Sequence, residues 1–111
     1  MNSYHRHQEL LNQVLLYISM NYKSMRLWKN NTGKALSFDL KRVLSYGLKG
    51  SADITGITEQ GIRIEIEIKT GKSVQSEAQR NFMNMIRSKG GIYIVCRELD
   101  YQEVINNVFR I

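Results

Sequence analysis

The chain of 111 residues has no proline and a single cysteine, Cys96. One cysteine cannot form an internal disulfide, and in the apolar run IYIVC a thiol packs as a small hydrophobic group. No run of about 18 apolar residues is present, which argues against a membrane-spanning helix. The N-terminal residues MNSYHRHQEL lack the apolar core of a secretory signal. These absences predict a cytoplasmic protein, and the length fits one domain over residues 1–111.

Acidic residues are scarce in the first half of the chain. Residues 1–50 hold eight Lys and Arg against two acids, Glu9 and Asp39, whereas residues 51–111 hold eight of each sign. The net charge of +6 therefore lies entirely in residues 1–50. Such asymmetry suits a polyanionic partner such as nucleic acid. An ordinary solvated basic surface explains it equally well.

Helical periodicity predicts three helices, over about residues 3–22, 76–90 and 100–109. Their starts are predicted from capping residues: Ser3 for the first helix, Ser76 with Gln79 in a capping box for the second, and Asp100 with Glu103 in a capping box for the third.

Strand patterns occur at residues 25–28, 43–47 and 91–96, and no pattern assigns residues 34–42. The near-continuous apolar run at 91–96 predicts a central strand covered on both faces. ADITGI at 52–57 and IRIEIEIK at 62–69 predict a β-hairpin around a short loop with glycine. One mixed β-sheet flanked by helices is the packing that these elements favour.

The register of this hairpin can be predicted from its polar and apolar positions. If Thr58 lies opposite Ile62, then Ile54 lies opposite Ile66, and both are apolar. Asp53 then lies opposite Glu67, whereas a slip of one residue would break both matches. The favoured register therefore sets two carboxylates on facing positions, with Cβ atoms about 5 Å apart.

Two carboxylates this close repel unless a cation lies between them. Magnesium is commonly held by one or two carboxylates together with water and substrate phosphate. Lys69 projects from the same face as Glu67, beside the expected ion. Asp53, Glu67 and Lys69 therefore indicate metal-assisted hydrolysis of a phosphodiester. A solvent-facing strand can also carry the Glu-x-Lys spacing by chance.

The order of the short motifs resembles a known nuclease family. GSAD at 50–53, followed across the hairpin by EIK at 67–69, resembles the PD-(D/E)xK nuclease superfamily. Within it, the chain is similar to the virus-type replication–repair nuclease (VRR-NUC) family. This likeness rests on four segments in the expected order: WKNNTG at 28–33, YGLKGSADITGI at 46–57, IEIKTG at 66–71 and SEAQRNFMNMIRSKGG at 76–91. Ala52 stands where the superfamily pattern has proline.

The resemblance implies a restriction-endonuclease-like α/β fold of order α-β-β-β-α-β-α, and Mg²⁺ or Mn²⁺ as cofactor. It implies Asp53, Glu67 and the carbonyl of Ile68 as metal ligands, and Lys69 as the catalytic lysine. It also implies site roles for two residues with ordinary alternatives: Gln79, which also fits the capping box, and Glu9, which also fits a solvent-facing helix position. Glu65 is predicted to lie at the surface or behind the site.

Other polar and aromatic residues are assigned simpler roles. His5 and His7 could suggest a zinc site, but residues two apart on a helix do not share a face. No other Cys or His cluster completes a set of four ligands, so both histidines are predicted at the surface. Trp28 is predicted in the core, with stacking on an exposed base as the alternative. Candidate phosphate contacts are Lys29, Lys34, Lys41, Arg42, Lys49, Ser51 and Lys72.

Together these features predict a magnesium-dependent endonuclease for DNA. The resembled family implies branched DNA as substrate, in the manner of Holliday-junction resolvases, and a homodimer, since each site cuts one strand. No membrane and no small-molecule cofactor are expected. Three alternatives remain: a restriction-type enzyme for duplex DNA, a DNA-binding module without catalysis, and an RNA nuclease.

Overall fold

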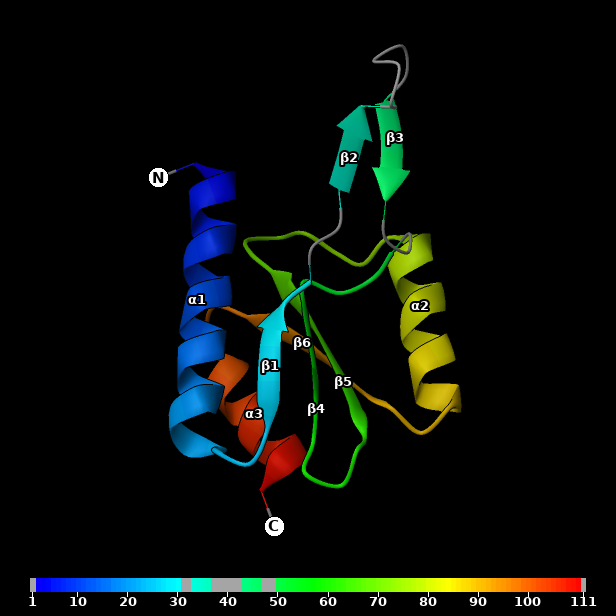
Figure 1. The fold of residues 1–111 in the computed structure, drawn as a ribbon. Helices are drawn as coiled ribbons and strands as arrows, with labels where there is room; N and C mark the ends of the chain where they lie inside the picture. The colour runs from blue at the N-terminus through cyan, green and yellow to red at the C-terminus, as the bar shows by residue number, and fades with distance from the viewer. Residues whose placement is uncertain (1, 31–32, 37–42, 47–49, 111) are drawn as a thin grey trace.

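The computed structural model describes residues 2–30, 33–36, 43–46 and 50–110 (Figure 1). The elements there follow in the order α1 (Ser3–Asn21), β1 (Arg26–Lys29), β2 (Gly33–Leu36), β3 (Val43–Tyr46), β4 (Ile54–Ile57), β5 (Arg63–Lys69), α2 (Glu77–Ser88), β6 (Ile92–Arg97) and α3 (Tyr101–Phe109). Strands β1, β4, β5 and β6 form one sheet in that spatial order, while β2 pairs with β3 alone. The four-stranded sheet and its helices confirm the predicted order α-β-β-β-α-β-α.

The β4–β5 hairpin has the predicted register. Ile54 pairs with Ile66, and the N–H of Thr58 donates to the carbonyl of Ile62 at 2.9 Å. Strand β6 runs parallel to β5, and α2 makes the crossover that a parallel connection requires. The sheet is therefore mixed, and β5 is hydrogen-bonded to a neighbour on each side.

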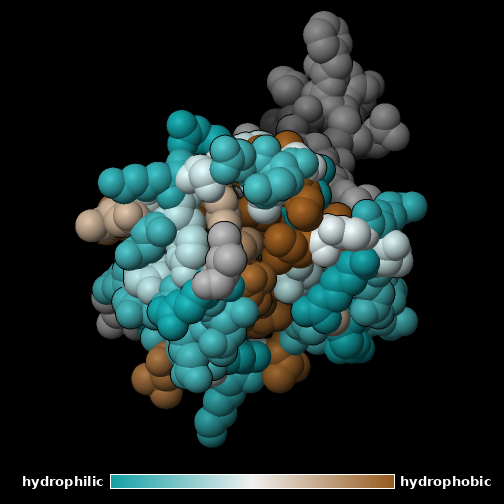
Figure 2. All heavy atoms as spheres, turned by 90° about the horizontal axis from the view of Figure 1, so that it is seen from below, coloured by the Kyte–Doolittle hydropathy of each residue, from teal (hydrophilic) through white to brown (hydrophobic). Residues whose placement is uncertain are grey.

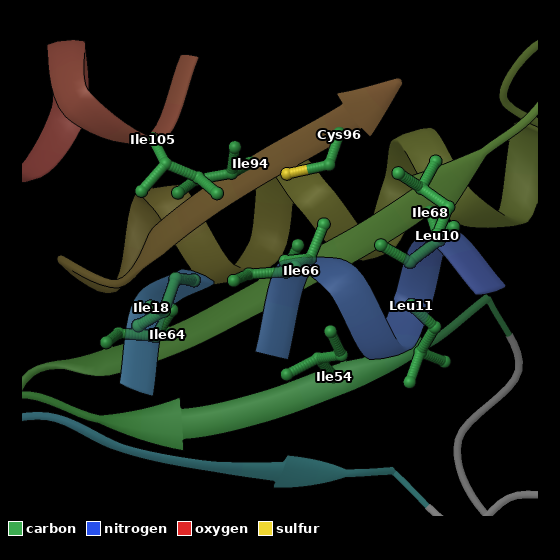
Figure 3. Packing of buried hydrophobic residues seen from close by; sticks show 11 residues of the cluster. Leu10, Leu11, Ile18, Ile54, Ile64, Ile66, Ile68, Ile94, Cys96 and Ile105 are labelled. Atoms are coloured by element: carbon green, nitrogen blue, oxygen red, sulfur yellow. The ribbon is translucent and has the colours of Figure 1, made fainter. Parts of the chain in front are cut away.

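The main core lies between this sheet and helices α1 and α3, while α2 covers the opposite face (Figure 1). Ile54 and Ile66 are buried in this core, and so is Cys96 of β6 (Figure 3). Burial raises the pKa of the Cys96 thiol to about 12, in keeping with its predicted role as a small apolar group. Because side chains alternate along a strand, the isoleucines of β5 face α1 and its charged residues face α2.

Two predicted helix starts differ in detail from the structure. The first helix is capped by Asn2, whose side chain accepts from the N–H of His5 at 2.9 Å, so Ser3 is already helical. Asp100 occupies the N-cap of α3 but makes no side-chain capping bond, and the second capping box is absent. The box of Ser76 with Gln79 at the start of α2 is confirmed.

Two predictions about the sheet are wrong. Strand β6 pairs only with β5 in the described sheet, so it is an edge strand there; its apolar run reflects cover by α2 and α3, not a central position. Trp28 is 53% exposed, not buried. Trp28 lies on the face of β1 opposite the partly buried Leu27. Helix α2 does not cover it, because α2 packs against β6, at the other edge of the sheet from β1.

Apolar side chains are exposed where β4 turns into β5. Ile57 and Ile62 flank this turn, and Ile62 precedes the strand that it was predicted to begin. Figure 2 views this end of the molecule and shows a band of apolar atoms between hydrophilic borders. Among the described residues, no helix is both long and apolar enough to cross a membrane.

Candidate active site

Asp53 directly precedes β4, and its side chain reaches across to β5. Its Oδ2 accepts a hydrogen bond from the backbone N–H of Ile68 at 2.7 Å. The N–H and carbonyl of a strand residue point to the same side, so the carbonyl of Ile68 faces Asp53 as well. The register, continued by one residue from Ile54, sets Asp53 opposite Glu67. The backbone therefore sets Asp53 and Glu67 on facing positions at the open end of the hairpin, with the carbonyl of Ile68 on the side of Asp53.

Glu67 is fully buried on the face that α2 covers. Its Oε1 accepts hydrogen bonds from the hydroxyl of Tyr93 at 2.6 Å and from the side-chain amide of Gln75 at 3.1 Å. Its Oε2 has no hydrogen-bond partner in the described structure, and Nζ of Lys69 lies 3.7 Å away. Leaving such an oxygen unpaired costs about 1–3 kcal/mol. A divalent cation, which takes carboxylate oxygens as ligands, would satisfy it.

Lys69 is held beside these acids by helix α2. Its Nζ donates to Oε1 of Gln79 at 2.9 Å. The same Oε1 accepts from the backbone N–H of Ser76 at 2.8 Å, which completes the capping box. Gln79 therefore caps the helix and fixes the position of the ammonium group at once. The capping box predicted for Gln79 is thus present, and the same oxygen also contacts Lys69.

A pair of substitutions separates the cap from the contact with Lys69. Ser76→Ala and Gln79→Ala each remove part of the capping box and are expected to cost about 1 kcal/mol of folding free energy. Only Gln79→Ala also frees Lys69, so it alone is expected to lower the phosphodiester hydrolysis that the sequence predicts, by about tenfold or more. Thermal unfolding and cleavage rates of both variants check this. If Ser76→Ala and Gln79→Ala lost equal activity, Gln79 would act only through the helix cap.

The pKa of Tyr93 reflects the acidic residues around it. Its pKa is raised, first by burial, then by its hydrogen bond to Glu67, and then by the negative charges of Glu67, Asp53 and Glu65. The Tyr93 hydroxyl is therefore influenced by two carboxylates of β5, Glu67 and Glu65, and by Asp53, which directly precedes β4. The hydroxyl remains a neutral donor to Glu67 at ordinary pH and fixes the orientation of that carboxylate.

Of the two positions predicted for Glu65, at the surface or behind the site, the structure excludes the first. This residue is fully buried, not at the surface, and its Oε2 lies 3.3 Å from Nε of Arg63. Its Oε1 and the hydroxyl of its cross-strand neighbour Thr55 are both buried without a hydrogen-bond partner among the described residues. The sequence pattern suggested an exposed strand face, but the apolar side of α2, with Phe82 and Ile86, covers this face.

Helix α1 does not bring Glu9 to Asp53. Glu9 is exposed; its Oε1 lies 3.5 Å from the amide nitrogen of Gln13, and it borders a hollow shared with Arg6 and Glu98. His7 instead faces the site, with Nε2 at 3.4 Å from Oδ1 of Asp53. Two residues span about 200° of an α-helix, so only one of Glu9 and His7 can point at Asp53. His7, which was predicted at the surface, is partly exposed and also contacts Asp53.

Two side chains that support Glu67 were not predicted, Gln75 and Tyr93. Gln75 lies in the loop before α2, where no periodic pattern marks it. Tyr93 stood out in the sequence as the polar-tipped residue of an apolar strand. Its partner became identifiable only once the parallel pairing placed it next to Glu65 and thus one pleat from Glu67.

The predicted phosphate contacts are only partly placed. Lys29 and Lys72 are exposed, and the hydroxyl of Ser51 accepts from the side-chain amide of Asn30 at 3.1 Å. The backbone of Lys34 lies in β2. Lys41, Arg42 and Lys49 lie outside the described residues. Next to Lys69 there is an open hollow of about 480 Å³, whose other lining residues are Arg6, Gly71, Arg97, Glu98, Leu99 and Asp100.

Gly50 brings the segment before Asp53 against the start of α2. Its φ is +79°, and a Cβ there would lie 2.3 Å from the carbonyl oxygen of Ala78. No other residue fits this backbone and this contact. Gly50 therefore forms a turn with positive φ, and its contact with Ala78 ties the segment of Asp53 to the helix that carries Gln79.

The donor set suits a divalent cation that keeps several waters more than a metal enclosed by protein ligands. Within residues 2–30 and 50–110, no three His, Cys, Asp or Glu side chains are already grouped as a metal cage. Magnesium keeps several waters and needs only one or two carboxylates, which Asp53 and Glu67 supply. Comparison of the sequence with protein-family models finds no match, and comparison with curated proteins finds none either.

Proposed function

We propose that this protein is a metal-dependent endonuclease that hydrolyses phosphodiesters in branched DNA. The observation that carries the proposal is the buried Oε2 of Glu67, which has no hydrogen-bond partner in the described structure and lies 3.7 Å from the ammonium of Lys69. Asp53 lies at the adjoining strand end, and the carbonyl of Ile68 faces it. The likeness of the motifs to the VRR-NUC family supports the same activity.

Asp53, Glu67 and the carbonyl of Ile68 would hold Mg²⁺ or Mn²⁺. When bound, such an ion supplies Lewis-acid stabilisation of phosphate charge and lowers the pKa of water. The chain supplies the rest of the site. Tyr93 and Gln75 orient Glu67, while Gln79 holds Lys69 where its ammonium can orient water or stabilise the charge that develops on the phosphate.

Charge and symmetry support DNA as the polymer and two copies as the active form. The excess of Lys and Arg in residues 1–50 suits a phosphate backbone. One site cuts one strand, so symmetric cleavage of a junction requires two subunits related by a two-fold axis. The apolar side chains Ile57 and Ile62, exposed at the β4–β5 turn, offer a surface for such a contact. A cytoplasmic setting is part of the same proposal.

The test is a panel of labelled four-way, flap, splayed-arm and linear duplex DNA, with matched RNA substrates, in Mg²⁺, Mn²⁺ or chelator. We expect four-way junctions to be cut fastest, in paired symmetric positions, and chelator to stop all cutting. Fast cutting of linear duplex would indicate a restriction-type enzyme, and preference for RNA a ribonuclease. DNA binding without cutting in either metal would identify a non-catalytic module and refute the proposal.

A further inference from the structure

His7 occupies a fixed position at the edge of the candidate site. Its side chain is 30% exposed, and Nε2 lies 3.4 Å from Oδ1 of Asp53. Leu10 and Leu11, one turn further along α1, are buried in the core and anchor the helix against the sheet. The imidazole is therefore held at Asp53 by the packing of α1. By contrast, His5 on the same helix is exposed.

The two oxygens of Asp53 have different surroundings. Oδ2 accepts a strong hydrogen bond from the N–H of Ile68 at 2.7 Å, whereas Oδ1 is the oxygen that faces His7. The lone pairs best placed for a cation are those of Oδ1, since Oδ2 is already engaged. The imidazole nitrogen thus lies next to the oxygen that an ion would bind.

The spacing of these two atoms matches two ligands of one ion. Neighbouring ligands of an octahedral ion at about 2.1 Å are separated by about 3.0 Å, close to the observed 3.4 Å. Neutral imidazole is a metal ligand through Nε2. A shift of a few tenths of an ångström in a partly exposed side chain would bring both atoms into one coordination sphere.

We propose that His7 donates a nitrogen ligand to the cation held by Asp53, so that the site prefers first-row transition ions over Mg²⁺. This rests on the proposed function for the existence of the cation site and adds the identity of a ligand from α1. Magnesium is satisfied by oxygen ligands, whereas imidazole favours Co²⁺ and its neighbours, whose affinities rise from Mn²⁺ to Co²⁺. Glu9 is not included among the ligands, because its side chain is exposed and its Oε1 lies 3.5 Å from the amide nitrogen of Gln13.

Calorimetric titration of the tag-free protein with Mg²⁺, Mn²⁺ and Co²⁺ tests this without any cleavage assay. We expect the wild-type protein to bind Co²⁺ at least about tenfold more tightly than Mg²⁺. His7→Ala should weaken Co²⁺ binding about tenfold and Mg²⁺ binding less than twofold. It should also change the visible absorption of bound Co²⁺. His5→Ala serves as the matched control on α1 and should change neither affinity.

His7→Gln separates ligation from simple orientation of Asp53, because glutamine keeps a hydrogen-bond donor but offers no imidazole. If His7 only orients Asp53, His7→Ala would weaken Mg²⁺ and Co²⁺ binding equally and His7→Gln would restore both, which would overturn the inference. Cation binding that depends on Glu67 but not on His7 would overturn it too, while leaving the proposed function intact. If the protein binds none of the three cations and cuts no DNA, both the inference about His7 and the proposed function are wrong.

Discussion

Replacement of Glu67 by glutamine is expected to reduce DNA cleavage by about 1000-fold or more while DNA binding persists. The ion that Glu67 would hold is worth several kcal/mol of transition-state stabilisation, and each 1.4 kcal/mol is about a factor of ten in rate. Glutamine retains the oxygen that accepts from Tyr93 and Gln75. The fold should therefore survive, and the loss should appear in single-turnover cleavage rates.

Glu65→Gln is the matched control for this result. Glu65 lies two residues away on the same strand, faces the same side and is equally buried. The same chemical change there should leave cleavage within about twofold of wild type, because its contact is with Arg63 and not with the site. If Glu67→Gln cuts as fast as Glu65→Gln, the mechanism built on Glu67 is wrong.

Replacement of Lys69 by methionine is expected to lower cleavage by about 100-fold or more. It removes the ammonium beside Glu67 and the donor to Gln79, with an apolar side chain of similar length. It also leaves Glu67 buried without a cation, so we expect a loss of about 3 kcal/mol in the free energy of unfolding. Cleavage rates and urea unfolding measure the two effects separately.

The double variant Glu67→Gln, Lys69→Met distinguishes these causes. Removing both charges should recover most of the lost stability, because neither charge is then left buried without the other. It should recover none of the activity, because both groups proposed for the chemistry are absent. Lys89→Met, at the exposed end of α2, controls for general loss of positive charge and should cut normally. Full activity in Lys69→Met would exclude a role for the ammonium in the chemistry.

The sequence predicted the hairpin and its register because strand periodicity leaves little freedom. Ile54 and Ile66 can both face a core in only one alignment, and that alignment also fixes the relation of Asp53 to Glu67. The capping box of Ser76 and Gln79 was also predicted, from residues three apart, although the same spacing at Asp100 and Glu103 forms no such box. Local patterns of this kind depend on residues close in sequence, so the sequence alone indicates their geometry.

Contacts between distant elements were less predictable. Whether Glu9 or His7 on α1 faces Asp53 depends on the rotation of the helix, which Leu10 and Leu11 set by packing on the sheet. Whether Glu65 is wet or buried depends on where α2 lies, and the strand pattern is the same in both cases. Trp28 is exposed because α2 packs against β6, at the opposite edge of the sheet from β1. Sequence periodicity does not encode these tertiary choices.

The contact of Gly50 with Ala78 has a consequence for how this protein can vary. A side chain at position 50 would push against the main chain of α2, and the displacement would pass through Gln79 to Lys69. A residue without functional groups of its own thus governs the alignment of two others. Directed evolution for new substrates should therefore tolerate change in the exposed surface of α2 far more readily than at this glycine.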